Sequence, residues 1–119
     1  MSLAQMQQIA EGLWVCPQLQ PDDFANAAAK GFRTIINARP DREGGAEQPD
    51  SAVLEVAAQN AGIHYEYLPV VPGQFTEQQV ATFDKHLTEL PGPVLAFCRS
   101  GNRCSLLWSA VQARRKAKQ

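Results

Sequence analysis

The sequence predicts an α/β fold: a three-layer sandwich in which a mostly parallel sheet carries helices on both faces. Short apolar runs alternate along the chain with amphipathic stretches, a pattern typical of strands that are joined through helices. Two of the amphipathic stretches end at a glycine, a residue that commonly terminates helices. A chain of 119 residues has the length of one domain, so we expect residues 1–119 to form a single domain.

The first part of the chain is expected to form a strand and then a helix. Residues 12–16 are a short apolar run that predicts a strand. The helix should begin at residues 21–23, because the acidic side chains there suit the positive end of a helix dipole. Gly31 should end it, since glycine readily adopts the left-handed conformation of a helix terminus.

A second strand, a loop and a second helix are predicted next. The β-branched run over 34–37 indicates a buried strand. A polar loop over 38–48, which contains two glycines, leads to a helix over 49–61 that ends at Gly62. Residues 63–71 are then expected to be extended, and Pro69 and Pro72 end this segment.

The last third of the chain supplies a third helix, a buried strand and a final helix. Thr76 and Gln79 have the spacing of a capping box at a helix start. Apolar residues follow at helical spacing, namely Val80, Phe83, Leu87 and Leu90. Residues 94–97 contain no polar side chain, which predicts a strand buried on both faces. The final helix is expected from about Ser105.

Composition argues against several classes of function. The formal net charge of −1 provides no strong field for nucleic acid or an anionic membrane, and neither is an expected partner. No apolar run approaches the ~20 residues that cross a bilayer, and residues 1–10 do not resemble a signal peptide. Three cysteines, an odd number, argue against a disulfide framework and favour the cytoplasm. The cysteines and histidines have no metal-binding spacing, so we expect no metal and no cofactor.

The strongest candidate site follows the last buried strand. Cys98 would be held rigidly at the strand end, and the helix after the loop would direct free amides toward it. Such amides, together with Arg103, should lower the pKa of the cysteine and make it a nucleophilic thiolate. Arg103 can also bind two oxygens of an oxyanion. Cys98 and Arg103 are therefore the candidate catalytic residues, and the candidate anion-binding residues are Arg99, Ser100, Gly101, Asn102, Arg103 and Cys104.

A second loop is expected at the same edge of the sheet. In parallel sheets, ligands bind beyond the carboxyl ends of the strands. Arg39, Asp41 and Arg42 follow the strand over 34–37, so Arg39 and Asp41 are candidate residues of the pocket rim. The alternative is that these residues belong to a solvated polar loop.

These segments resemble the phosphatase-like domain family of beta-lactamase hydrolase-like proteins. The similarity rests on GLWV at residues 12–15, IINARPD at 35–41, PV and PG at 69–73, and CRSGNR at 98–103. It implies a dual-specificity-phosphatase-like fold, with Cys98 as the nucleophile and Arg103 as the anion-binding arginine.

Two departures from the phosphatase pattern favour a different reaction. Only four residues separate Cys98 from Arg103, the loop length of rhodaneses, whereas phosphatases of this kind have five. Those phosphatases also use an upstream aspartate as a general acid, and the corresponding residues 70–74 contain no acid. Without such a proton donor an alkoxide leaves roughly 10²–10⁴-fold more slowly. Sulfur transfer expels sulfite or a thiolate and needs little protonation.

Three hypotheses follow from these residues. The first is a rhodanese-type sulfurtransferase that forms a persulfide on Cys98, with a small anionic sulfur donor and a thiol acceptor as partners. The alternative is a phosphatase that acts on a small phosphoester through a cysteinyl-phosphate. The third is a non-catalytic anion-binding module. Cys104 takes a position where related enzymes carry a hydroxyl residue, and it could also resolve an oxidised Cys98. The sequence leaves any protein partner unknown.

Overall fold

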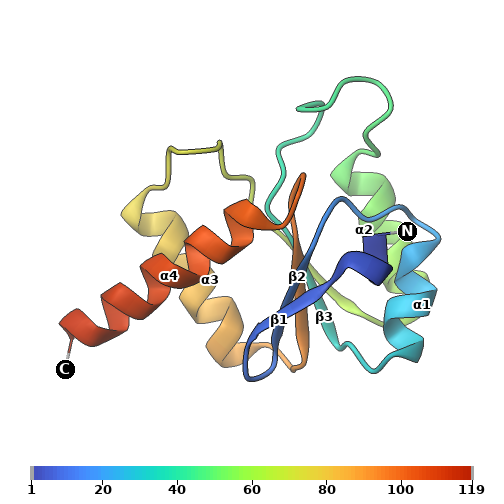
Figure 1. Cartoon of the computed structure of the whole chain (residues 1–119). Helices are drawn as coiled ribbons and strands as arrows, with labels where there is room; N and C mark the ends of the chain where they lie inside the picture. Colours follow the sequence, from blue (N-terminus) through green and yellow to red (C-terminus); the bar gives the residue numbers. More distant parts are fainter. Residues whose placement is uncertain (1, 119) are drawn as a thin grey trace.

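The computed structural model describes residues 2–118 and has a five-stranded sheet at its centre (Figure 1). The strand order is β1-β2-β5-β3-β4. The strands are β1 (Gln7–Ala10), β2 (Leu13–Cys16), β3 (Thr34–Asn37), β4 (His64–Tyr67) and β5 (Val94–Phe97). All neighbouring pairs are parallel except β1 and β2, which pair antiparallel. The predicted mostly parallel sheet is confirmed, with β5 in the middle.

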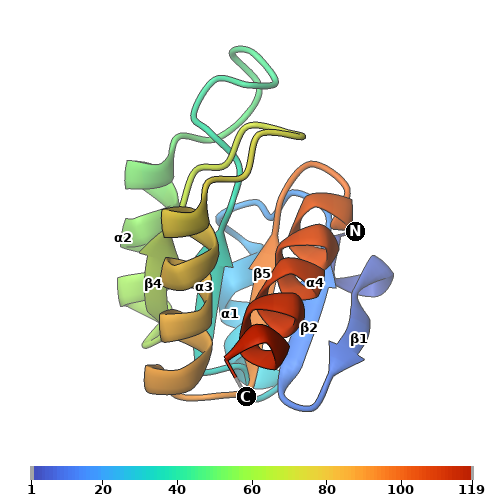
Figure 2. The ribbon, with the colours of Figure 1, turned by 90° about the vertical axis from the view of Figure 1, so that its left-hand side faces the viewer.

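Helices cover both faces of the sheet (Figure 2). Helices α1 (Asp23–Ala29) and α2 (Ser51–Ala61) pack on one face, and α3 (Glu77–Glu89) and α4 (Asn102–Ala117) pack on the other. A short 3-10 helix, η1 (Ser2–Gln5), precedes β1. The three-layer sandwich predicted from the alternating pattern is therefore confirmed.

Alternation along β5 decides where Cys98 lies. Val94 and Ala96 pack on the side of α3 and α4, whereas Leu95 and Phe97 pack on the side of α1 and α2. All four side chains are buried, as their apolar character predicts. Cys98 continues the first of these rows, so its thiol lies between the end of β5 and the start of α4.

The elements begin and end close to the predicted residues, with two exceptions. Strands β3 and β5 have the predicted bounds, and the capping box of Thr76 and Gln79 is present. Strand β1 was not predicted, because its residues QQIA are polar or partly exposed at the sheet edge and show no strong apolar pattern. Helix α4 begins at Asn102 and not at Ser105, since Gly101 takes the left-handed conformation (φ 95°) that starts the helix directly.

Three connecting segments meet at the carboxyl edge of the parallel strands (Figure 2). They follow β3, β4 and β5, and they comprise residues 38–50, 68–76 and 98–101. This edge is where a parallel sheet usually holds its ligands. Among residues 2–118, no helix has both the length and the apolar character that a membrane span requires.

Two neighbouring residues of α2 should differ sharply in their contribution to stability. Leu54 is fully buried against the sheet, whereas Val53 is 51% exposed. We expect Leu54→Ala to lower the free energy of unfolding by roughly 2–5 kcal/mol, and Val53→Ala to change it by less than about 0.5 kcal/mol. Urea unfolding of both variants measures the difference. Equal effects would contradict the burial of α2 against this face of the sheet.

Candidate active site

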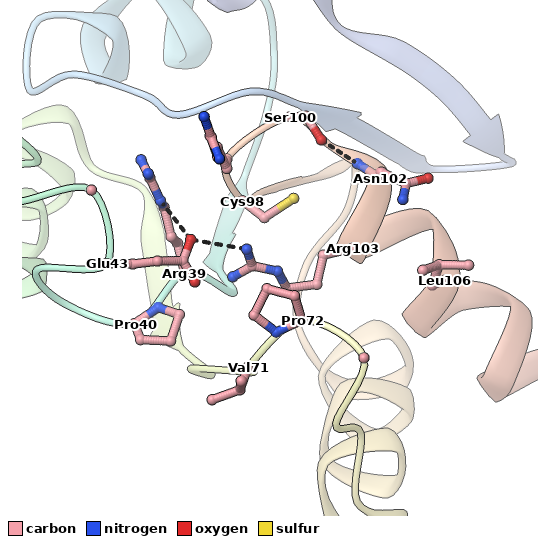
Figure 3. Close-up of a pocket in the computed structure, with 13 residues that line it drawn as sticks. Arg39, Pro40, Glu43, Val71, Pro72, Cys98, Ser100, Asn102, Arg103 and Leu106 are labelled. Carbon is pink, nitrogen blue, oxygen red and sulfur yellow. Dashed lines mark hydrogen bonds and ion pairs between the residues drawn. The ribbon is translucent and has the colours of Figure 1, made fainter.

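A cavity with a volume of about 850 Å³ opens at the carboxyl edge of the sheet (Figure 3). It lies where the segments after β3, β4 and β5 meet the first turns of α4. Its lining comprises Arg39, Pro40, Glu43, Gly44, Val71, Pro72, Gly73, Cys98, Arg99, Ser100, Asn102, Arg103 and Leu106. The candidate nucleophile, two arginines and one carboxylate therefore share one cavity.

Cys98 lies at the base of this cavity with its sulfur surrounded by donors. The residue is 1% exposed, and the backbone N–H of Gly101 donates to its Sγ at 3.0 Å. The backbone N–H groups of Ser100 and Cys104 also donate to the sulfur. The conformation of Gly101 makes this turn possible, because glycine adopts its positive φ of 95° at little cost. Converging amide donors of this kind stabilise an anion.

The pKa of Cys98 falls to about 5, well below its ordinary value. The main cause is the hydrogen bond from the Cys104 side chain, and burial opposes the shift. The amides of Cys104, Ser100 and Gly101 lower the pKa further. Conversely, the hydrogen bond to Cys98 and burial raise the pKa of Cys104 well above its ordinary value. At neutral pH the pair therefore holds a thiolate on Cys98 and a thiol on Cys104. The sequence predicted that amides and Arg103 would lower the pKa of Cys98. It did not predict that the Cys104 side chain would make the largest contribution to this shift.

Arg103 is buried beside the nucleophile and ties the loops together. Its Nη1 donates to the carbonyls of Ala38 at 3.3 Å and Val70 at 3.0 Å. Its Nη2 donates to Oε1 of Glu43 at 2.9 Å. Its Nε is buried and has no acceptor among the described residues. Because Nε and Nη2 form one edge of the guanidinium, this edge can still receive an oxyanion.

Glu43 lies between two arginines, an arrangement that the sequence did not predict (Figure 3). Its Oε1 accepts from Arg103 and also from Nε of Arg39, at 3.0 Å. Burial of the carboxylate opposes ionisation, but the hydrogen bonds from Arg103 and Arg39 outweigh it and lower the pKa of Glu43. The only available signal was an acid four residues after Arg39, in a loop already expected to border the pocket.

Local packing holds Arg39 in this position. The side chain of Asn37, at the end of β3, accepts from the backbone N–H of Arg39 at 2.9 Å and donates to the Tyr65 hydroxyl at 3.0 Å. Nη1 of Arg39 donates to the Gln18 side chain at 3.0 Å. A methyl group placed on Gly44 would lie 2.5 Å from Nη2 of Arg39, so glycine lets the loop close over the guanidinium.

The other predicted site residues divide between the cavity and its surroundings. Arg99, Ser100 and Asn102 line the cavity, as do Arg39 and Arg103. Gly101 supplies an amide from behind the loop, and Cys104 lies beneath Cys98 in the first turn of α4.

Asp41 and Arg42, by contrast, are not among the residues that line the cavity. The Asp41 carboxylate accepts from the backbone N–H of Ser51 at the start of α2, because the loop turns toward that helix after Pro40. Arg42 lines a separate, smaller hollow. Across residues 2–118, no group of three or more His, Cys, Asp or Glu side chains could hold a metal ion.

The cavity has one charged side and one apolar side. Arg39, Glu43 and Arg103 form the charged side, and Val71 and Leu106 form much of the apolar rim, with exposed fractions of 49% and 47%. Such a site can bind an anionic group against the thiolate and leave an apolar substituent at the rim.

The family model described as "Beta-lactamase hydrolase-like protein, phosphatase-like domain" matches residues 5–115. The chain belongs to this family. The match covers nearly all of the chain, including the three segments that line the cavity, so the expected family is confirmed.

Individual relatives agree with this assignment. A beta-lactamase hydrolase-like protein from Xylella fastidiosa is 37% identical over 101 residues, which cover 85% of this chain and 23% of that protein. The phosphatase-like domain thus spans about a quarter of the length of that relative. The crystal structure of a candidate phosphatase from Neisseria meningitidis is 39% identical, with a TM-score of 0.78, and the match covers 85% of this chain and 71% of that one.

A more distant structure extends the likeness of the fold. The kinase associated phosphatase has a TM-score of 0.66 at 16% identity, and the match covers 83% of this chain and 63% of that one. The phosphatase-like domain therefore has the dual-specificity-phosphatase-like fold that the resemblance implied. The family and its relatives favour a cysteine-based, phosphatase-like enzyme. They do not support the sulfurtransferase that loop length had placed first.

The thiol of Cys104 should control the acidity of Cys98. In the wild type, the rate of Cys98 alkylation by iodoacetamide should rise with pH around a midpoint of about 5. Cys104→Ala removes the hydrogen bond that contributes most, so the midpoint should move upward. Cys16→Ala is the matched control, because Cys16 does not donate to Cys98, and its midpoint should stay near that of the wild type. A wild-type midpoint at the ordinary thiol value of about 8.5 would contradict the account.

Proposed function

We propose that this domain is a cysteine-dependent phosphatase that acts on a small phosphoester through a cysteinyl-phosphate on Cys98. The observation that carries the proposal is the presence, in one cavity, of a thiolate and of an Arg103 edge whose Nε has no acceptor among the described residues. A thiolate needs no general base, and the arginine edge matches two oxygens of a phosphoryl group. Family membership and the relative from Neisseria meningitidis support the same reaction.

The proposed reaction has two displacement steps. The Cys98 thiolate attacks phosphorus, an S–P bond forms, and the bond from phosphorus to the ester oxygen breaks with its electron pair on that oxygen. Water then attacks phosphorus, the S–P bond breaks, and inorganic phosphate and the thiolate are released. Arg103 and the loop amides stabilise the charge on the phosphoryl oxygens in both transition states.

Sulfur transfer remains a second candidate because of one observation, the length of the loop. Four residues between Cys98 and Arg103 correspond to the rhodanese pattern. In this reaction the Cys98 thiolate attacks the outer sulfur of a small anionic donor, sulfite leaves, and a thiol acceptor removes the sulfur from the persulfide. Both candidates suit a reducing compartment such as the cytoplasm, where Cys16, Cys98 and Cys104 stay free.

The intermediate on Cys98 distinguishes the two candidates. The wild type should hydrolyse para-nitrophenyl phosphate, and an acid quench should trap one phosphoryl group per chain by intact mass. Cys98→Ser should reduce turnover to background. Arg103→Ala should lower kcat/KM roughly 10²–10³-fold, since it removes a donor to the transition state. Arg114→Ala, further along α4, is a matched control and should keep full activity.

Two outcomes would contradict the phosphatase proposal. One is hydrolysis that survives in Cys98→Ser. The other is a protein that gains one sulfur atom from thiosulfate but no phosphoryl group from the ester, and this result would favour the sulfurtransferase.

A further inference from the structure

The cavity that contains Cys98 is lined by one acidic residue that could serve as the proton donor of a phosphatase, among the residues described. Residues 70–74, where such enzymes carry an aspartate, supply only Val71, Pro72 and Gly73 to the cavity. Glu66 lies 3.8 Å from His86, and Asp41 caps α2, so neither is directed into the cavity. Glu43 is the acidic residue that lines it, among the residues described.

One of the two Arg103 nitrogens that suit a phosphoryl group, Nη2, also binds this acid. Nη1 donates to two backbone carbonyls and Nη2 donates to Glu43, while Nε has no acceptor within residues 2–118. Nη2 carries two N–H groups, so a phosphoryl group that binds Nε and Nη2 together would share Nη2 with the Glu43 carboxylate. Repulsion between the two negative groups then favours displacement of Glu43 from Nη2. Glu43 would then lie beside the bound oxyanion, still on its short loop.

We propose that Glu43 protonates the leaving group of the phosphoester, and that Arg103 and Arg39 hold it until the substrate replaces it at Arg103. This proposal rests on the phosphatase function proposed above. It assigns the missing acid to the loop after β3, on which the sequence predicted Arg39 and Asp41 as residues of the pocket rim. It also extends the substrate class to alkyl phosphoesters, whose poor leaving groups require a proton.

Electrostatics explain how an ionised carboxylate becomes an acid in the complex. In the free protein, hydrogen bonds from two arginines overcome the effect of burial and favour the charged form of Glu43. When a phosphoryl dianion takes Nη2, Glu43 loses one of these donors and gains a negative neighbour. Both changes favour the protonated form, so the carboxyl takes up a proton from solvent as the substrate binds.

The proton balance then closes over the two steps. As the bond between phosphorus and the ester oxygen breaks, the leaving oxygen takes the proton of Glu43 and departs as an alcohol. Glu43 is left as a carboxylate. It accepts a proton from the water that attacks the cysteinyl-phosphate. When phosphate leaves, Glu43 returns this proton to solvent and binds Arg103 again as a carboxylate, and this completes the cycle.

Loop geometry keeps Glu43 close to the reacting group after it leaves Arg103. The contact of Glu43 with Arg39 remains available. The Gln48 side chain accepts from the backbone N–H of Gly44 at 2.7 Å and donates to the Pro40 carbonyl at 2.8 Å. These bonds brace the loop on both sides of Glu43, so its carboxyl group moves while its backbone is held.

A comparison of two esters tests this role. The readout is kcat/KM for beta-glycerophosphate, an alkyl ester, divided by kcat/KM for para-nitrophenyl phosphate, whose leaving group needs no proton. Glu43→Gln should lower this ratio roughly 10²-fold, and Glu43→Asp should lower it less. Glu47→Gln is an exposed control on the same loop and should leave the ratio unchanged. Activity on the aryl ester shows that each variant is folded.

Two results would overturn the role of Glu43 but keep the phosphatase function. One is a ratio in Glu43→Gln that equals the wild-type ratio. This would hold if both activities rise together, as expected for a carboxylate that only competes with substrate, or if both fall together. The other is wild-type protein that hydrolyses the aryl ester but not the alkyl ester. Wild-type protein that hydrolyses neither ester would instead overturn the proposed function, and the role of Glu43 with it.

Discussion

The buried guanidinium of Arg103 is the group on which the arrangement of the site depends. It reaches from the first turn of α4 to the carbonyls of Ala38 and Val70 and to the carboxylate of Glu43, and so joins the segments that follow β3, β4 and β5. A buried arginine must be hydrogen-bonded, and here the loops of the site supply the acceptors. Arg103 therefore both fixes the loops that form the cavity and supplies its positive charge.

The nucleophile and the arginine have separate electrostatic supports. Cys98 is kept as a thiolate mainly by the thiol of Cys104 and by amides of its own loop, while Arg103 is balanced by Glu43. A thiolate beside an anion-binding loop suits phosphoryl transfer and sulfur transfer equally. What separates the two reactions is the supply of a proton to the leaving group. The identity of the acid therefore matters more for this protein than the length of its loop.

Sequence reasoning succeeds where the physics is local. The apolar run over 94–97 and the glycine and arginine that follow it predict a strand, a turn and a helix, and these place Cys98 and Arg103 together. Glu43 could not be predicted in this way, because its partners Arg39 and Arg103 lie four and sixty residues away and meet only through the sheet order. Asp41 was predicted at the pocket because it lies two residues from Arg39 in sequence, but its side chain binds the start of α2 instead. Strand β1 was missed because edge pairing leaves no apolar signature.

The proposed chemistry depends on the binding of an oxyanion by Arg103 and the Cys98 loop, and a crystal structure of the wild type grown with sulfate tests this binding. We expect sulfate over Cys98, with oxygens accepting from Nε and Nη2 of Arg103 and from loop amides, and with Glu43 displaced from Nη2. Sulfate absent from the loop at saturating concentration, with Arg103 still bound to Glu43, would contradict it.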